Sequence, residues 1–199
     1  MANVLEKKHG GDSIEFSTRR GNEKDYHQQA PKVYLVGAGP GDPRLITVAG
    51  AQRIAEADVV LYDYLVNHEL LADVDAGTEL ICLGHHSTGR IMSQEEINTR
   101  MIESARQGKV VVRLKCGDPC VFGRSAEEIA ALVDAEIAFE IVPGVTAGIA
   151  AGACARVPLT RASDAPAVAL VTGWQRGDDT LLDYAALASF PGTLVSIWA

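Results

Sequence analysis

The chain has 199 residues, of which 47% are hydrophobic and 22% are charged, and its formal net charge is −8. This composition is that of a globular protein, and the acidity argues against a nucleic-acid surface, which usually needs a basic face. No apolar run reaches the length that spans a membrane, and residues 1–30 contain no signal-peptide core. We therefore expect a cytoplasmic protein that binds neither nucleic acid nor membrane.

Residues 1–30 are polar and lack a sustained hydrophobic periodicity, so we expect a disordered extension there. From Lys32 onward, strand and helix patterns alternate. Strands are predicted at 32–36, 58–62, 79–83, 110–114 and 139–142, and helices at 45–57, 93–107 and 125–135. Ser93 and Glu96 form a capping-box pattern, and Gly108 predicts where that helix ends. The alternation predicts an α/β domain over residues 31–143, with a mainly parallel sheet covered by helices on both faces.

Pro143 and Gly144 predict a hinge to a second α/β domain, residues 144–199. The predicted elements are a small-residue helix at 146–155, strands at 167–172 and 193–198, and a helix at 181–188. The chain stops on strand residues, which would leave neighbouring strands unpaired. We therefore expect the second domain to be truncated.

A glycine-rich loop follows the first strand of the α/β pattern, in the sequence VYLVGAGPGDP of residues 33–43. Strand, glycine turn and helix are the layout of a nucleotide-type site in an α/β sheet. The glycines are spaced G-x-G-x-G rather than G-x-G-x-x-G, and Pro40 lacks the amide that a pyrophosphate would use. The loop therefore predicts an adenosyl ligand without a phosphate tail. Asp42 either caps the next helix or faces a cationic sulfonium.

Charged residues stand out at two further places, one at the end of a predicted strand and one at the start of a predicted helix. Asp63 ends an apolar strand, so it lies at the carboxyl edge of the sheet, as a ligand contact or as a turn residue. Arg124 and Glu127 lie three residues apart at a helix start and share a face, which is the usual arrangement of a surface ion pair.

Six blocks in chain order resemble the tetrapyrrole methylase family. They are residues 33–43, 57–66 (ADVVLYDYLV), 93–98 (SQEEIN), 112–124 (VRLKCGDPCVFGR), 142–147 (VPGVTA) and 157–160 (VPLT). The resemblance covers Lys32 to the end of the chain. It implies a fold of two α/β domains and a homodimer. It also implies a class III methyltransferase that uses S-adenosyl-L-methionine to C-methylate uroporphyrinogen III to precorrin-2, for sirohaem or cobalamin.

The resemblance also implies roles for individual residues. The expected S-adenosylmethionine contacts are Pro40, Cys116, Gly117, Asp118, Thr146, Ala147 and Trp198. The expected tetrapyrrole contacts are Asp42, Leu65, Arg113 and Phe122, and the expected catalytic residues are Asp63, Arg124 and Glu127. Arginine suits the carboxylates of a tetrapyrrole because it binds them bidentately. Plainer interpretations stay open: Thr146 as a helix cap, Phe122 as core packing, and Arg113 with Lys115 as strand-end charges.

Several residues depart from the family pattern. Cys116 replaces a glycine, and it would cost about 1–2 kcal/mol if that position requires a positive φ. Ala162, Trp174 and Trp198 replace an arginine, a histidine and a cofactor-contacting methionine of relatives. Together with the expected truncation, these departures predict weak activity for the 199-residue chain.

Three other functions stay open. The first is a nicotinamide enzyme with a degenerate glycine loop, in which Asp63 would bind ribose. The second is a non-catalytic relative that binds tetrapyrrole or cofactor, and the third is a sister methylase acting on a corrin intermediate or on ribosomal RNA. We expect no metal, because Cys116 and Cys120 have only His85 and His86 to complete a zinc site, and we expect the thiols to be reduced.

Overall fold

The computed structural model describes residues 6–8, 15–17, 32–72, 74–85, 90–173 and 182–197. Its contacts divide the chain into two parts, Met1–Ala30 and Pro31–Ala199. In the first part, β1 (Glu6–Lys8) and β2 (Glu15–Ser17) pair antiparallel, where the sequence predicts no strand. The disorder of this extension and a domain boundary at residue 143 stay predictions.

The second part contains a five-stranded sheet in the order β5-β4-β8-β3-β9. The strands are β3 (Val33–Gly37), β4 (Val59–Tyr62), β5 (Glu79–Cys82), β8 (Val111–Lys115) and β9 (Phe139–Val142). Every neighbouring pair is parallel. The predicted parallel α/β sheet is therefore confirmed, and all of its strands lie close to their predicted bounds.

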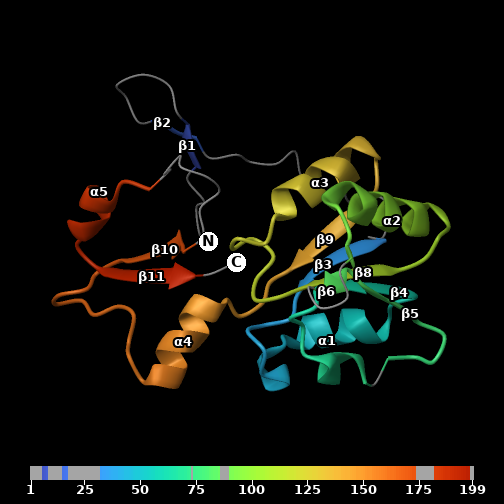
Figure 1. Ribbon diagram of the computed structural model, residues 1–199, viewed down its shortest axis with the longest axis horizontal. Coiled ribbons are helices and arrows are strands. Elements are labelled where there is room, and N and C mark those ends of the chain that lie inside the picture. Colours follow the sequence, from blue (N-terminus) through green and yellow to red (C-terminus); the bar gives the residue numbers. More distant parts are fainter. Residues whose placement is uncertain are drawn as a thin grey trace. The chain divides into compact units, whose positions relative to one another are not determined.

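Helices cover both faces of this sheet (Figure 1). The helix α1 (Val48–Ala55) lies on one face, and α2 (Gln94–Arg106) and α3 (Ser125–Asp134) lie on the other. Successive side chains of a strand point to opposite faces, so one strand serves two cores. Val33 and Leu35 pack in the core on the α2 and α3 side, whereas Val36 packs in the core on the α1 side.

The helix starts follow local capping chemistry. The prediction of one helix from residue 45 is wrong at its start, because Pro43–Leu45 forms a separate short 3-10 helix, η2, and Thr47 caps α1 by accepting from Gly50 N–H at 3.0 Å. The capping box of α2 is confirmed. Ser93 Oγ accepts from the Glu96 amide at 3.1 Å, and the Glu96 carboxylate accepts from the Ser93 amide at 2.7 Å.

A second, smaller parallel sheet contains β10 (Val168–Thr172) and β11 (Thr193–Ile197). It is accompanied by α4 (Ala147–Ala155) and α5 (Tyr184–Ala188). A Cβ on Gly148 of α4 would lie 2.9 Å from a methyl carbon of Val195, so the small residues of this helix allow tight packing on the sheet. Trp174 and Trp198 lie outside the described residues.

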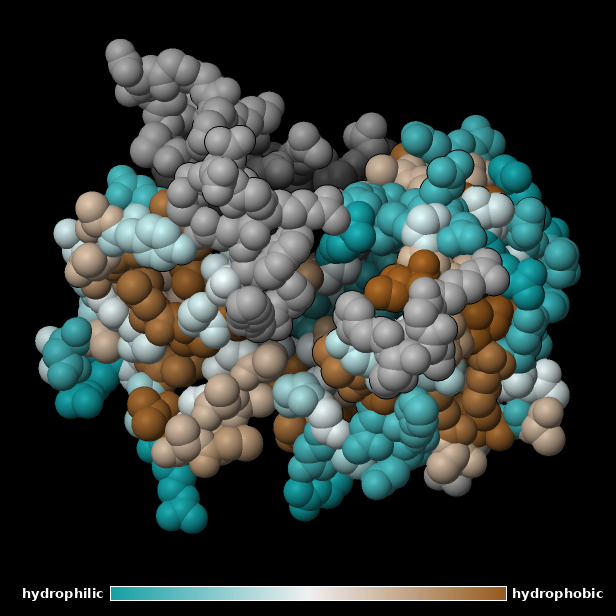
Figure 2. Space-filling view, in the orientation of Figure 1, coloured by the Kyte–Doolittle hydropathy of each residue, from teal (hydrophilic) through white to brown (hydrophobic). Residues whose placement is uncertain are grey.

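Apolar residues gather on the surface over α4, β10 and β11 (Figure 2). Ile149 is 55% exposed, and Val168 and Leu194 are each 41% exposed. An open groove of about 620 Å³ runs along the end of α4; it is lined by Ile149, Gly152, Ala153, Arg156, Val157, Pro158, Leu159, Thr160 and Val168.

Three short elements complete the described chain: η3 (His68–Leu71), β6 (Gly84–His85) and β7 (Arg90–Ile91). The sequence predicts none of them as separate elements. Among the described residues, no helix is long and apolar enough to cross a membrane, and no group of three or more His, Cys, Asp and Glu side chains could hold a metal ion. His86 and the side chain of His85 lie outside the described part.

Candidate active site

Three loops meet where β3, β8 and β9 end. Gly39 and Gly117 form an antiparallel bridge, with amide-to-carbonyl distances of 3.1 and 2.8 Å in the two directions. The Asp118 carboxylate reaches the third loop by accepting from Gly144 N–H at 2.9 Å, and it accepts from Cys120 N–H at 2.8 Å. One carboxylate thus joins the loop after β8 to the loop after β9.

Glycines allow the three loops to approach this closely. A Cβ on Gly37 would lie 2.6 Å from Gly144 Cα and 2.7 Å from Gly117 O, distances that no side chain can adopt. On the other side of the loop, a Cβ on Gly117 would lie 3.7 Å from Thr146 Cα and 3.8 Å from Ala147 N. Backbone atoms from all three loops therefore form one surface, which we call the backbone cradle.

The residues predicted to bind the cofactor lie around this backbone cradle, apart from Trp198, which is outside the described residues. Pro40 follows the bridged Gly39, and Cys116, Gly117 and Asp118 make up the start of the second loop. Thr146 occupies the N-cap position of α4, but its side chain makes no capping hydrogen bond. Thr146 is only 7% exposed.

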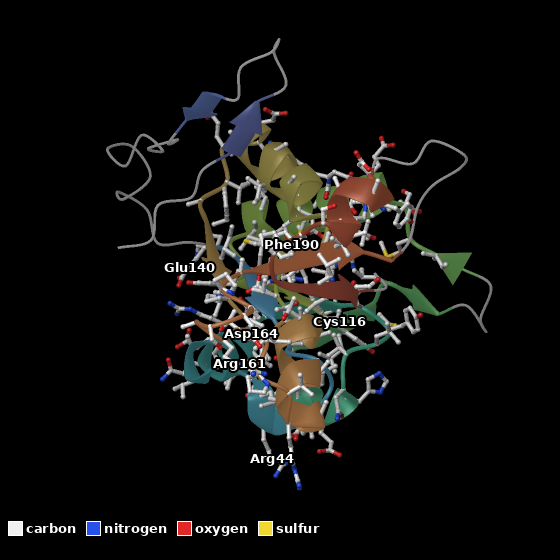
Figure 3. All side chains as sticks on the ribbon, turned by 90° about the vertical axis from the view of Figure 1, so that its left-hand side faces the viewer. Arg44, Cys116, Glu140, Arg161, Asp164 and Phe190 are labelled. Carbon is white, nitrogen blue, oxygen red and sulfur yellow. The ribbon has the colours of Figure 1, made fainter. Side chains whose placement is uncertain are left out.

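Cys116 carries none of the backbone strain considered from the sequence. The left-handed conformation belongs to its neighbour Gly117, at φ 65°, while Cys116 has no positive φ. Burial, and next the negative charge of Asp63, raise the pKa of the Cys116 thiol to about 11. In Figure 3, Cys116 lies within the outline of the ribbon, whereas Arg44 reaches out beyond it.

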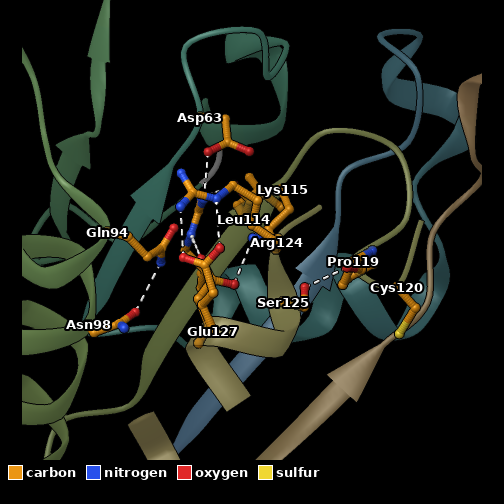
Figure 4. A network of polar contacts seen from close by, with 12 residues as sticks. Asp63, Gln94, Asn98, Leu114, Lys115, Pro119, Cys120, Arg124, Ser125 and Glu127 are labelled. Carbon is orange, nitrogen blue, oxygen red and sulfur yellow. Dashed lines mark hydrogen bonds and ion pairs between the residues drawn. The ribbon is translucent and has the colours of Figure 1, made fainter. Parts of the chain in front are cut away.

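Asp63 is held at the end of β4 by an arginine from the neighbouring strand β8. Arg113 Nη2 donates to Asp63 Oδ1 at 2.6 Å (Figure 4). The amide of Cys116 donates to Asp63 Oδ2 at 3.4 Å. The Asp63 side chain is 32% exposed and that of Arg113 only 5%. The predicted position of Asp63 at the carboxyl edge of the sheet is therefore confirmed, and its carboxylate also contacts the start of the second loop.

The Arg113 guanidinium belongs to a buried network that also includes Lys115 and Glu128. Arg113 Nε donates to Glu128 Oε1 at 2.9 Å and Arg113 Nη1 to the Leu114 carbonyl at 3.0 Å. Lys115 Nζ donates to Glu128 Oε2 at 2.6 Å. Burial works to lower the pKa of Arg113, but the charges of Asp63 and Glu128 and their hydrogen bonds together raise it. Burial, followed by the charge of Arg113, lowers the pKa of Lys115.

Sequence reasoning missed Glu128 and selected its neighbour Glu127. The signal was present in the helix pattern, because Ser125, Glu128 and Leu132 are spaced as one buried face of α3. Glu127 lies on the exposed side and pairs with Arg124 at 2.7 Å, with side chains 49% and 57% exposed. The ion pair expected from their spacing is thus present, and their catalytic roles stay predictions.

The residues predicted to contact substrate differ in their surroundings. Leu65 is 65% exposed, and Phe122 is 39% exposed with a left-handed φ of 52°. Asp42 is engaged within its own loop: its carboxylate accepts from the Arg44 amide at 3.0 Å and pairs with the Arg44 guanidinium at 2.6 Å. The Arg44 hydrogen bonds lower the pKa of Asp42 to about 2.

Asn67 is a second residue that the sequence did not indicate. Its amide nitrogen donates to the Gly41 carbonyl at 2.9 Å, and its side-chain oxygen accepts from the Glu69 amide at 2.9 Å. The segment after Asp63 is therefore tied to the glycine-rich loop at the edge of the backbone cradle.

Comparison with known families gives one match along most of the chain. Residues 32–197 match the model of the family described as Tetrapyrrole (Corrin/Porphyrin) Methylases. A uroporphyrinogen-III C-methyltransferase of Priestia megaterium is 45% identical over 174 residues, which are 80% of this chain and 73% of that protein. A siroheme synthase of Zymomonas mobilis is 46% identical over 173 residues, or 87% of this chain. The chain spans only 36% of that synthase's length.

The chain is also similar to solved structures of methyltransferases. The uroporphyrin-III C-methyl transferase of Thermus thermophilus, complexed with S-adenyl homocysteine, is 40% identical with a TM-score of 0.68. The match covers 83% of this chain and 65% of that one. A cobalt precorrin-4 methyltransferase from cobalamin biosynthesis is 38% identical with a TM-score of 0.66, over 74% of this chain and 59% of the other.

Proposed function

Because the chain belongs to the tetrapyrrole methylase family, we propose that it uses S-adenosyl-L-methionine to C-methylate uroporphyrinogen III to precorrin-2. The observation that carries this proposal is the likeness to the Thermus thermophilus enzyme in its complex with S-adenyl homocysteine. The identity to the Priestia megaterium methyltransferase supports the same reaction and substrate.

The backbone cradle fits an adenosyl ligand better than a dinucleotide. Its walls are peptide groups and small residues, and Pro40 removes an amide donor at the place where a dinucleotide fold binds pyrophosphate. We assign cofactor binding to Pro40, Cys116, Gly117, Asp118, Thr146, Ala147 and Trp198. The cofactor supplies a methyl group on a positively charged sulfur, which an electron-rich carbon can attack.

The chain's own contribution is mainly proximity and orientation. Asp63 is held by Arg113 yet is 32% exposed, so its carboxylate can accept a hydrogen bond from a pyrrole N–H, stabilise the cationic macrocycle that methyl transfer leaves, and help to move the proton that the macrocycle then loses. Arg124, with a side chain 57% exposed, offers a guanidinium for the carboxylates of the tetrapyrrole, and Glu127 orients it. Leu65 and Phe122 offer exposed apolar surface for the rings. Asp42, within the glycine-rich loop, is a further proposed contact to the tetrapyrrole.

Two binding measurements and one assay test this function. Isothermal titration calorimetry with S-adenosylhomocysteine should show binding, and titration with NAD should show none. Incubation with S-adenosylmethionine and uroporphyrinogen III should yield precorrin-2, followed by its absorbance. Binding of NAD without binding of S-adenosylhomocysteine would contradict the proposal.

The likeness to the cobalt precorrin-4 methyltransferase supports a second candidate, a sister methylase acting on a corrin intermediate. Binding of S-adenosylhomocysteine together with methylation of a corrin, and not of uroporphyrinogen III, would favour that candidate.

We further propose that two copies of the chain form a homodimer in the cytoplasm. The four cysteines, Cys82, Cys116, Cys120 and Cys154, are all free in the structure, which suits a reducing compartment. Light scattering after size exclusion should give twice the mass of one chain, and a monomeric mass would contradict the dimer.

A further inference from the structure

Two cations on β8 point toward the same helix. Arg113 and Lys115 are two residues apart on the strand, so their side chains leave the sheet on one face, the face that α3 covers. Both are almost fully buried, with side chains 5% and 3% exposed. Glu128 of α3 has no exposed side-chain surface and gives one oxygen to each cation, at 2.9 and 2.6 Å.

Such a network is costly unless every charge has a partner. Here two cations, Arg113 and Lys115, meet two carboxylates, Asp63 and Glu128, so the buried charges balance. Asp63 alone among the four is substantially exposed, at 32%. The network therefore runs from the interior of the sheet–helix layer to the edge of the candidate site.

Three acceptors fix the plane of the Arg113 guanidinium. Its Nε donates to Glu128, its Nη1 to the Leu114 carbonyl and its Nη2 to Asp63. A planar guanidinium that is held at one edge presents its other donors in fixed directions. The direction from which Asp63 receives its 2.6 Å hydrogen bond thus depends on where Glu128 holds Nε.

We infer that Glu128 is a positioning residue for Asp63, acting through Arg113. This inference rests on the proposed function, because it takes Asp63 to be the carboxylate that faces the substrate. Lys115 pairs with the second oxygen of Glu128, so that both carboxylate oxygens of this fully buried side chain have a cationic partner. Arg113, predicted to touch the substrate, instead orients the residue that does.

Two double variants test the inference while keeping the buried charge balanced. In K115M/E128M, one cation and one anion are lost together, and such an exchange for apolar residues is often neutral for stability. K115M/E128Q removes the same charges but leaves an amide oxygen that can accept from Arg113 Nε. The exposed pair of Arg161 and Asp164, 3.2 Å apart, provides the control R161M/D164M.

The expected results separate positioning from folding. Both network variants should bind S-adenosylhomocysteine with a Kd within about twofold of the wild type. In K115M/E128M, kcat should fall at least about tenfold with KM little changed, and K115M/E128Q should recover most of that loss. The control should match the wild type. Equal kcat in the two network variants, or a kcat of K115M/E128M within about twofold of the wild type, would overturn the inference.

A crystal structure of K115M/E128M gives a readout that needs no turnover. We expect the Arg113 guanidinium to turn and the Asp63 carboxylate to leave its wild-type position while the two stay paired, and an unchanged position of the Asp63 carboxylate would overturn the inference. If the wild type binds S-adenosylhomocysteine but does not methylate uroporphyrinogen III, the proposed substrate is wrong, and the crystal structure still decides whether Glu128 positions Asp63.

Discussion

Gly117 and Gly144 lie so close together that a side chain on Gly144 would overlap the carbonyl oxygen of Gly117. The Gly144 amide is at the same time bound by the carboxylate of Asp118 at 2.9 Å. The two loops are therefore joined through backbone atoms and one short side chain, at the place where we propose that the cofactor binds.

Gly144→Ala should damage both the fold and the cofactor site. The added methyl group must push apart two backbones, and such overpacking costs about 1–3 kcal/mol in the free energy of unfolding. We also expect the Kd for S-adenosylhomocysteine to rise at least about tenfold. Urea unfolding and calorimetry measure the two effects.

Gly77→Ala is the matched control, because its Cβ would meet only a carboxylate oxygen of Asp75, at 3.2 Å. A Gly144→Ala protein that resembles this control in both measurements would show that the loops are not closely packed.

Cys116→Gly restores the residue that the family pattern has, and we expect it to give no gain in stability. Cys116 has no positive φ and packs against the core that includes Val36 and Leu114. Glycine there loses this packing and adds freedom to the unfolded chain, so the free energy of unfolding should fall by about 0.5–1 kcal/mol. Urea unfolding would show instead a gain of about 1–2 kcal/mol if Cys116 were strained.

Arg44→Ala should raise the pKa of Asp42 from about 2 toward 3.8, its ordinary value, because the largest cause of the lowering is the Arg44 side-chain hydrogen bond. A carboxyl group with a folded-state pKa below its unfolded one stabilises the fold above the unfolded pKa and loses this effect as the pH falls. In the wild type this loss occurs between pH 3.8 and about 2. The variant should show a shallower dependence of stability on pH in that window.

The chemical shift of the Asp42 carboxyl carbon, followed by NMR as the pH is varied, measures the change in pKa directly. Arg53→Ala serves as the control, since its guanidinium binds Glu56 and Glu140 instead. An unchanged titration of Asp42 in Arg44→Ala would mean that Arg44 and Asp42 do not form an ion pair in this loop.

The central strands of the parallel sheet could be predicted because they contain short apolar runs that are buried on both faces, as in residues 33–36 and 111–112. The capping box at Ser93 could also be predicted, because it depends on two residues that are only three positions apart. The start of α1 was not, since Pro43 and the Asp42 cap allow a separate 3-10 turn that hydrophobic periodicity cannot distinguish from a helix.

The strand-end motifs of the candidate site could be predicted from the sequence, but its buried charge network could not. Gly117 and Gly144 could be noted as loop residues, yet their contact depends on the strand order, which brings β3 between β8 and β9. Glu128 was missed because a buried glutamate is rare unless it is paired. Its partners, Arg113 and Lys115, come from a strand that sequence spacing does not relate to the helix.

Asp63→Asn and Arg124→Ala should both reduce methylation far more than cofactor binding, and they should differ in stability. We place both residues on the substrate side, so kcat should fall by about 100-fold or more while the Kd for S-adenosylhomocysteine stays within about twofold. Asp63→Asn also deprives the buried Arg113 of a charged partner. Because Asp63 is 32% exposed, we expect a loss of about 1–3 kcal/mol, below that of a fully buried pair.

Arg124→Ala breaks an ion pair whose side chains are 57% and 49% exposed, so its free energy of unfolding should stay within about 0.5 kcal/mol of the wild type. Calorimetry, steady-state assays and urea unfolding on the same preparations measure all three quantities. A parallel fall of cofactor affinity and activity in both variants would show that these residues do not lie on the substrate side. A loss of stability in Arg124→Ala equal to that in Asp63→Asn would show that the exposed pair supports the fold as much as the buried one does.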